Sequence, residues 1–225
     1  LECMTCDQAG VARGKLMPAE KFFNAPNMNI PSSVLTQTIT GDYADDDDNF
    51  QHDPVDSDLI LKPDLSTLTV VPWANDPTGQ IIHDAFYKNG DPVDISPRNV
   101  LKKILNEYEA LGLRPVIAPE LEFYLVDPTE DHPQAPCSPV TGKRLESDGA
   151  LSLDELQHFD EFLNDVYDAC ELQGIPADAA ISENGAGQFE INMRHVADPL
   201  RAADDAVLFK RLVRGIARKH GFAAT

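Results

Sequence analysis

The chain has 225 residues, of which 42% are hydrophobic, and this is enough to build one large or two small domains around a buried core. Its formal net charge of −20 excludes nucleic acid and anionic membranes as expected partners, because both bind basic surfaces. No apolar run approaches the length of a bilayer span, and the first residues lack the basic and apolar stretches of an export signal. We therefore expect a soluble, cytoplasmic protein.

Residues 1–94 predict a small α+β or β-rich domain made of short strands and turns. The clearest strand patterns are Leu59–Leu61, Thr67–Val71 and Gln80–Phe86, which are rich in β-branched and apolar residues. The acidic stretch 42–58 includes four consecutive aspartates, but it lacks the glycine and the closing glutamate of a calcium-binding loop. We expect this stretch to be a solvated loop.

Four cysteines are an ordinary number for a reduced cytosolic protein of this size. Cys3 and Cys6 have the spacing of half a zinc or redox motif, but no second half is present. We expect free thiols at all four positions, namely Cys3, Cys6, Cys137 and Cys170.

A second domain is predicted to begin at residue 95, where Ser96 can cap a helix that has Pro97 at its first position. The helix carries one apolar stripe and ends at Gly112. Residues 127–149 form a long polar loop of the kind that often serves as a lid or binding element. A capping box at Ser152–Glu155 opens a helix that ends near Gly174. The last helix starts at Asp198-Pro199 and ends at His220-Gly221, and residues 222–225 have the pattern of a strand.

The strand pattern at Ile117–Val126 contains Glu120 and Glu122, which point to the same face because side chains alternate along a strand. In Ile181–Met193, Glu183 precedes a glycine-rich turn, after which Glu190 shares a face with two polar residues while the other face is apolar. Four carboxylates on two core segments favour a site for Mg²⁺ or Mn²⁺, which take oxygen ligands. The alternative to a metal site is that each strand belongs to a half-exposed sheet and turns these polar residues toward solvent.

The motifs Pro119–Phe123 and Glu183–Glu190, supported by Gly10–Lys15, resemble the glutamine synthetase family over nearly all of the chain. The resemblance implies an α+β fold, with an N-terminal β-grasp domain at 1–94 and the first part of the creatine-kinase-like, sheet-plus-helices catalytic domain at 95–225. It implies that Glu122, Glu183 and Glu190 hold one divalent metal, Mg²⁺ or Mn²⁺, and that Glu120 contributes to a second. Gln188 would line the ATP pocket or simply orient the neighbouring glutamates.

The resemblance also implies the reaction. ATP would phosphorylate the γ-carboxylate of glutamate, and an amine would then attack the γ-glutamyl phosphate. The resemblance further implies a homo-oligomer, which in this family is a ring dodecamer. Two cations would screen two anionic reactants and stabilise the transferred phosphoryl group. We assign no catalytic residue within the chain, and Arg13 and Lys15 are expected to be structural.

One departure bears on the amine. Glutamine synthetases proper usually carry an aspartate and a glycine before paired serines, whereas this chain has Ile30-Pro31-Ser32-Ser33. The pattern favours the γ-glutamyl-polyamine or γ-glutamyl-amine ligase branch, with an ammonia-using glutamine synthetase as the alternative. A non-catalytic assembly or regulatory relative is a further alternative, and an unrelated two-metal hydrolase is disfavoured because only His195 lies near either motif.

The family's remaining site residues would lie beyond Thr225. They include its histidine-bearing asparagine-glycine-serine motif, its substrate-binding arginines and its last metal-binding glutamate. We therefore expect the chain to be a fragment that is inactive alone.

Overall fold

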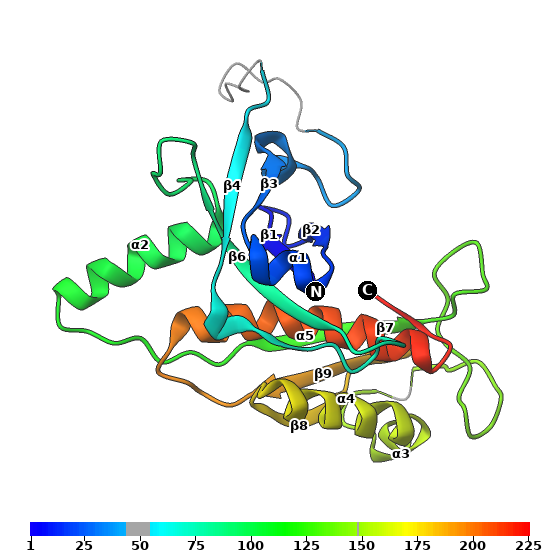
Figure 1. Cartoon of the computed structure of the whole chain (residues 1–225). Coiled ribbons are helices and arrows are strands. Elements are labelled where there is room, and N and C mark those ends of the chain that lie inside the picture. The colour runs from blue at the N-terminus through cyan, green and yellow to red at the C-terminus, as the bar shows by residue number, and fades with distance from the viewer. Residues whose placement is uncertain (44–54, 148) are drawn as a thin grey trace. The chain divides into compact units, whose positions relative to one another are not determined.

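The structure is a computed structural model that describes residues 1–43, 55–147 and 149–225. The chain divides into two compact units (Figure 1). Unit 1 consists of Leu1–Val71 and Pro77–Pro115, and unit 2 consists of Pro72–Asp76 and Val116–Thr225. Most of the predicted acidic loop at 42–58 lies outside the described residues.

Unit 1 is built on a mixed six-stranded sheet with the order β2-β1-β6-β4-β3, in which β5 also pairs with β6. Among the strand pairs that the structure describes in this sheet, only β1 and β6 run parallel. The strands are β1 (Glu2–Cys6), β2 (Ala12–Leu16), β3 (Met28–Pro31), β4 (Asp58–Pro63), β5 (Thr69–Val70) and β6 (Gly79–Phe86). Helices α1 (Ala19–Asn24) and α2 (Pro97–Ala110) and two 3₁₀ turns, Ser32–Thr36 and Leu65–Thr67, complete the unit.

The core of unit 1 is apolar and lies between the sheet and its short helical segments. Strand β6 runs through its centre, and its Ile81 and Ala85 are fully buried beside Leu61 of β4 and Leu35. The predicted strands at Leu59–Leu61 and Gln80–Phe86 are confirmed, while a 3₁₀ turn replaces the beginning of the strand expected at Thr67–Val71. The mixed sheet with helices supports the α+β class, and the more specific β-grasp assignment stays a prediction.

Helix α2 is attached to unit 1 through polar side chains in its first turn. Arg98 bridges Asp64 and Asp84, and Asn99 Nδ2 donates to the Ala85 and Val93 carbonyl oxygens. The apolar stripe of the helix is partly exposed, as its members Val100, Ile104 and Tyr108 keep 40–44% of their surface accessible. Helix α2 clusters with unit 1, whereas the predicted division at 94/95 places it in the second domain, and that division stays a prediction.

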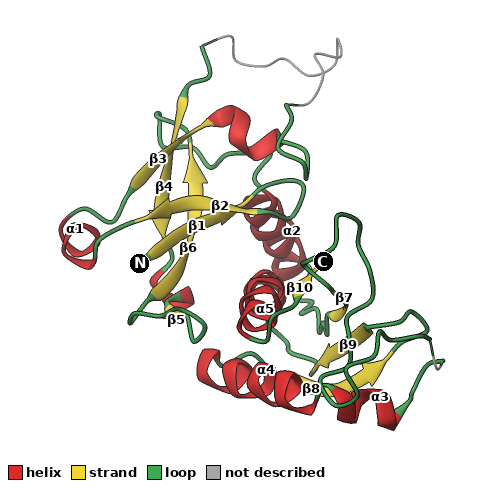
Figure 2. Ribbon diagram, turned by 90° about the vertical axis from the view of Figure 1, so that its right-hand side faces the viewer, coloured by secondary structure: helices red, strands yellow, loops and turns green. Residues whose placement is uncertain are grey.

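Unit 2 contains a four-stranded antiparallel sheet with the order β10-β7-β9-β8 and three helices (Figure 2). The strands are β7 (Glu120–Val126), β8 (Ala177–Ser182), β9 (Gln188–Met193) and β10 (Ala223–Ala224). The helices are α3 (Leu153–His158), α4 (Asp160–Gln173) and α5 (Pro199–Lys219). The expected strand pattern at 222–225 is confirmed by β10, which pairs with β7.

The helix boundaries of unit 2 follow their capping residues. The Ser152 side chain accepts a hydrogen bond from the Glu155 amide, and Asp198 accepts one from the Arg201 amide. Gly174 adopts a left-handed φ of 69° and ends α4. The single helix expected between Ser152 and Gly174 is wrong, because the chain leaves helical geometry at Phe159, whose ring is buried in the core.

Aromatic rings fill the core of unit 2. Phe123 of β7 packs on Phe189 of β9 and on Phe162 and Phe209 of the helices, with ring centroids 6.1–6.5 Å apart. These rings lie on one face of the β7–β9 pair, so the residues between them along each strand point to the opposite face. None of the helices in the described part of the chain combines the length and apolar character that a bilayer crossing requires.

A close approach between β1 and β2 gives a first prediction. An added Cβ at Gly14 would lie 1.9 Å from the Cys3 carbonyl oxygen, so we expect Gly14→Ala to push the strands apart and to lower the free energy of unfolding by about 1–3 kcal/mol. Urea denaturation measures the loss. Gly79→Ala is the matched control, because its Cβ comes closer than 3.0 Å only to the flexible end of the Leu1 side chain. Equal stability of the two variants would contradict the expected clash.

Asp205 of α5 gives a pH-dependent prediction. Burial raises the pKa of Asp205 to about 6 against the opposing effect of Arg201, whose Nε lies 2.7 Å from its carboxylate. Because the folded state holds this proton more tightly than the unfolded state, its stabilisation is present below about pH 4 and is lost as the pH rises to about 6. The change is at most about 3 kcal/mol, and this figure already includes the opposing effect of Arg201.

Urea denaturation between pH 4 and pH 7 measures this loss. We expect Asp205→Asn to remove that part of the pH dependence, whereas Asp168→Asn, at an exposed position of α4, leaves it unchanged. The same slope in the parent chain and in Asp205→Asn would contradict the assignment.

Candidate metal centre

The register of β7 and β9 sets the geometry of the acidic face. Glu122 pairs directly with Glu190, and Glu120 pairs with Asn192. Directly opposed residues of an antiparallel pair lie on the same face, with Cβ atoms about 4.5–5.5 Å apart. The structure therefore brings together three of the predicted site residues, Glu120, Glu122 and Glu190, opposite the phenylalanine core.

Glu183 reaches the same place from the turn between β8 and β9. Its backbone N–H donates to the Gln188 backbone carbonyl oxygen at 2.8 Å. The Gln188 backbone N–H donates to the Gly185 carbonyl oxygen at 2.8 Å, and these two hydrogen bonds make the turn tight. Partial burial raises the pKa of Glu190, and its interactions with the carboxyl groups of Glu120, Glu183 and Glu122 raise it further.

The donor chemistry of this set fits a hard divalent cation, because all four side chains offer carboxylate oxygens. Carboxylates that lie close together repel one another, and a bound cation relieves that repulsion. Within residues 1–43, 55–147 and 149–225, no three histidine, cysteine, aspartate or glutamate side chains converge closely enough to form a ready metal site. The ligand set of Glu120, Glu122, Glu183 and Glu190 therefore stays a prediction.

Gln188 contacts a predicted metal ligand. Its Nε2 donates to Glu122 Oε2 at 2.7 Å, and its Oε1 accepts a hydrogen bond from the Tyr124 hydroxyl at 2.9 Å. This contact agrees with the orienting role that the sequence left open, while a place for Gln188 in the ATP pocket stays a prediction. Sequence reasoning missed Tyr124, although its position two residues after Glu122 on one strand puts both on one face.

The turn that carries Glu183 is held on two sides. The Gly187 amide donates to Glu155 Oε1 at 3.2 Å, which connects the turn to the start of α3. The Ser147 hydroxyl donates to the Asn184 carbonyl oxygen at 2.5 Å, which connects it to the long loop at 127–149. Gly187 has a φ of 74°, a conformation that favours glycine. These contacts fix where Glu183 leaves the sheet.

In unit 1, the basic residues of the Gly10–Lys15 motif bind their own unit. Arg13 forms an ion pair with Asp7 at 2.7 Å, and Lys15 Nζ donates to the Asn29 carbonyl oxygen at 2.6 Å. The expected structural role of both residues is thus supported by these contacts.

The paired serines of unit 1 contact an aspartate that sequence reasoning missed. The Ser32 and Ser33 hydroxyls donate to the two carboxylate oxygens of Asp56 at 3.1 and 2.8 Å, and the Ser33 amide also donates to it. Asp56 follows the serines by 23 residues or more, so no local motif marks the contact. The aspartate expected before the serines is replaced in sequence by Ile30-Pro31, while a carboxylate reaches the serines from a different part of unit 1.

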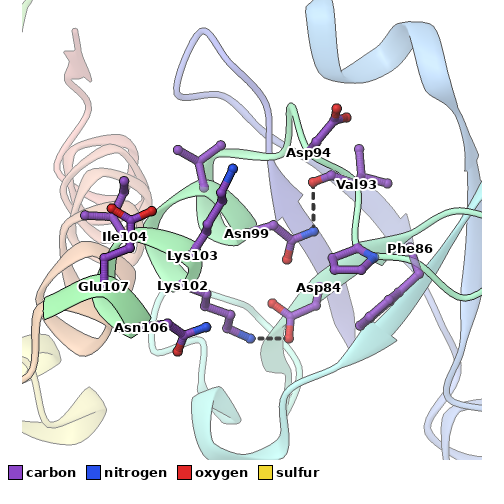
Figure 3. Close-up of a pocket in the computed structure, with 12 residues that line it drawn as sticks. Asp84, Phe86, Val93, Asp94, Asn99, Lys102, Lys103, Ile104, Asn106 and Glu107 are labelled. Carbon is purple, nitrogen blue, oxygen red and sulfur yellow. Dashed lines mark hydrogen bonds and ion pairs between the residues drawn. The ribbon is translucent and has the colours of Figure 1, made fainter. Parts of the chain in front are cut away.

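Unit 1 also contains a cleft of about 670 Å³ between α2 and the end of β6 (Figure 3). Part of its polar lining is engaged within the unit, since Lys102 Nζ lies 2.5 Å from Asp84 Oδ2 and Asn99 donates to backbone carbonyl oxygens. The residues that line the cleft include none of the predicted site residues.

Residues 94–225 match the family model described as the glutamine synthetase catalytic domain, which is more than half of the chain. The chain therefore belongs to the glutamine synthetase family. The family resemblance drawn from the two glutamate motifs is confirmed.

Two curated relatives have names that specify an amine. The chain is 38% identical to gamma-glutamylputrescine synthetase PuuA of Escherichia coli (strain K12), with 100% of this chain and 48% of the relative covered. It is 35% identical to glutamate–isopropylamine ligase of a Pseudomonas species, with 97% of this chain and 48% of the relative covered. The chain spans about half the length of these relatives. A solved GmaS/ADP complex has the same fold, with a TM-score of 0.81 at 24% identity over 100% of this chain and 47% of that one.

The opposed carboxylates give a prediction about stability. We expect Glu190→Gln to raise the free energy of unfolding at neutral pH, without added metal, by up to about 1 kcal/mol, because it removes one of two like charges in a cross-strand pair. It should also reduce the increase in melting temperature that MnCl₂ produces, because a cation that binds the folded state stabilises it.

Thermal unfolding with and without MnCl₂ measures both effects. Glu171→Gln, at an exposed position of α4, is the matched control and should change neither. An unchanged response of Glu190→Gln to MnCl₂ would argue against Glu190 as a ligand.

Proposed function

We propose that the chain provides part of an ATP-dependent ligase that joins the γ-carboxylate of glutamate to an amine through γ-glutamyl phosphate. The single observation that carries the proposal is the direct pairing of Glu122 with Glu190, beside Glu120 and Glu183, in a chain of the glutamine synthetase family. Names of its relatives support ligase chemistry.

The proposed role of the acidic face follows from the charges of the reactants. Glutamate and ATP are both anions, and a chain with a net charge of −20 does not attract them by itself. Bound Mg²⁺ or Mn²⁺ would supply the positive charge that screens the reactants and the transferred phosphoryl group. Glu122, Glu183 and Glu190 would hold one cation and Glu120 would contribute to a second. Strands β7 and β9 keep Glu120, Glu122 and Glu190 in register, and the β8–β9 turn carries Glu183.

We further propose an organic amine as the acceptor. The relatives named for putrescine and isopropylamine support this choice, and so does the absence of an aspartate directly before Ser32 and Ser33. Two observations favour ammonia as the alternative: Asp56 places a carboxylate on these serines, and relatives named glutamine synthetase are 31% identical over 76% of this chain. We propose a cytoplasmic homo-oligomer, with a ring dodecamer as the family pattern, whose active site combines the N-terminal domain of one subunit with the catalytic domain of the next.

The proposal predicts which amine supports phosphate release. We expect the full-length protein, meaning the polypeptide that the complete reading frame encodes, to release phosphate from ATP with glutamate, Mg²⁺ and an alkyl amine such as putrescine, isopropylamine or ethanolamine. Ammonium should support a lower kcat/KM. A coupled phosphate assay measures the release, and the 225-residue chain alone is expected to be inactive.

The outcomes separate the candidate functions. Preference for ammonium would make the protein a glutamine synthetase, and release without any amine would point to a hydrolase. No release with any amine would favour the non-catalytic relative. Glu122→Gln in the full-length protein is the control for the metal site and should lose the activity.

A further inference from the structure

Three hydrogen bonds connect the side chain of Gln188 to its neighbours on the acidic face of unit 2. The Tyr124 hydroxyl lies 2.9 Å from Gln188 Oε1, the Gly185 amide lies 3.0 Å from the same oxygen, and Gln188 Nε2 lies 2.7 Å from Glu122 Oε2. Tyr124 and Gln188 are also directly paired in the β7–β9 register. The side-chain amide of Gln188 thus connects the β8–β9 turn to Glu122, one of the predicted metal ligands.

The chemistry of the contacts assigns the orientation of the Gln188 amide. A backbone N–H only donates, so the atom that faces the Gly185 amide has to be the carbonyl oxygen Oε1. The NH₂ group is then left to face Glu122, to which it donates. If the side-chain amide turned over, its NH₂ group would face the Gly185 N–H, which cannot accept, and its oxygen would face the Glu122 carboxylate, which cannot donate.

Gly185 is needed for this arrangement. An added Cβ at this position would lie 2.5 Å from the Tyr124 hydroxyl and 2.7 Å from Gln188 Oε1, which is closer than real Cβ contacts. The backbone of the turn therefore comes near enough to hold both side chains only because residue 185 has no side chain. This contact explains why residue 185 of the Glu183–Glu190 motif is a glycine.

We propose that Tyr124, Gly185 and Gln188 form an amide clamp that positions Glu122 for divalent cation binding. The clamp rests on the proposed function, because it needs Glu122 to be a cation ligand. Gln188 is a positioning residue here, and its donated hydrogen bond holds Oε2 of Glu122 as an acceptor in one fixed orientation. Hydrogen bonds from neighbouring groups commonly orient metal-binding side chains, and their loss typically lowers metal affinity about 10- to 100-fold.

The test measures Mn²⁺ affinity of the full-length protein by electron paramagnetic resonance, which does not depend on turnover. We expect Gln188→Leu to weaken Mn²⁺ binding about 10- to 100-fold. Tyr124→Phe, which removes one hydroxyl, should weaken it less. In the double variant Tyr124→Phe/Gln188→Leu the hydroxyl should have no further effect, because it acts only through the amide.

Tyr167→Phe is the matched control. Its hydroxyl also donates a hydrogen bond within unit 2, at 2.9 Å to the Asp178 carbonyl oxygen, and its removal should leave Mn²⁺ affinity unchanged. Circular dichroism checks that each variant is folded. Tyr124→Phe keeps the ring and so tests the clamp even where Gln188→Leu disturbs the turn.

Failure of the clamp and failure of the metal site give different results. If the parent protein binds no Mn²⁺, or if Glu122→Gln binds it as tightly as the parent does, both the metal site and the clamp are wrong. If Glu122→Gln loses affinity but Gln188→Leu and Tyr124→Phe match Tyr167→Phe, only the clamp is wrong. Additive losses in the double variant would also overturn it.

Discussion

The alternation of side chains along β7 and β9 ties the acidic face of unit 2 to its hydrophobic core. Phe123 pairs directly with Phe189 on the core face, so Glu122, one residue before Phe123, and Glu190, one residue after Phe189, have to oppose each other on the other face. A register slip of one residue in either strand would turn its phenylalanine toward the acidic side. Burial of each aromatic ring is worth about 1.5–3 kcal/mol, whereas like charges in a cross-strand pair cost at most about 1 kcal/mol. The core therefore sets the register, and the repulsion between the glutamates is retained.

The β8–β9 turn adds a fourth carboxylate without lengthening either strand. The backbone amide of Glu183 donates to the backbone carbonyl oxygen of Gln188 across the turn. Glu183 is therefore held beside the first residue of β9. Glycine serves two separate purposes in between: Gly185 allows side chains of β7 and β9 to approach the backbone, and Gly187 adopts a left-handed conformation. The turn is thus built for close packing as much as for reversal of the chain.

The period-2 pattern was sufficient to predict from the sequence that Glu120 and Glu122 share a face, and that Glu190 lies opposite an apolar face. Local signals likewise predicted the caps at Ser152 and Asp198. The contacts that complete the site were beyond such signals, because they join residues distant in sequence: Gln188 and Glu122 are 66 residues apart. The break of the α3–α4 helix at Phe159 depends on tertiary packing of a buried ring, which no propensity records.

The neighbours of the opposed glutamates explain why this face suits a cation. Glu122 receives a hydrogen bond from the neutral side-chain amide of Gln188, and the groups that act on Glu190 are the carboxyl groups of Glu120, Glu122 and Glu183. A lysine or arginine in place of these partners would form an ion pair, cancel the negative charge and compete with a metal for the same oxygens. A neutral donor orients a carboxylate while leaving its charge in place. The combination of oriented carboxylates and uncancelled charge is what distinguishes a cation-binding face from an ordinary polar face of a sheet, because the latter gains stability by pairing its charges internally.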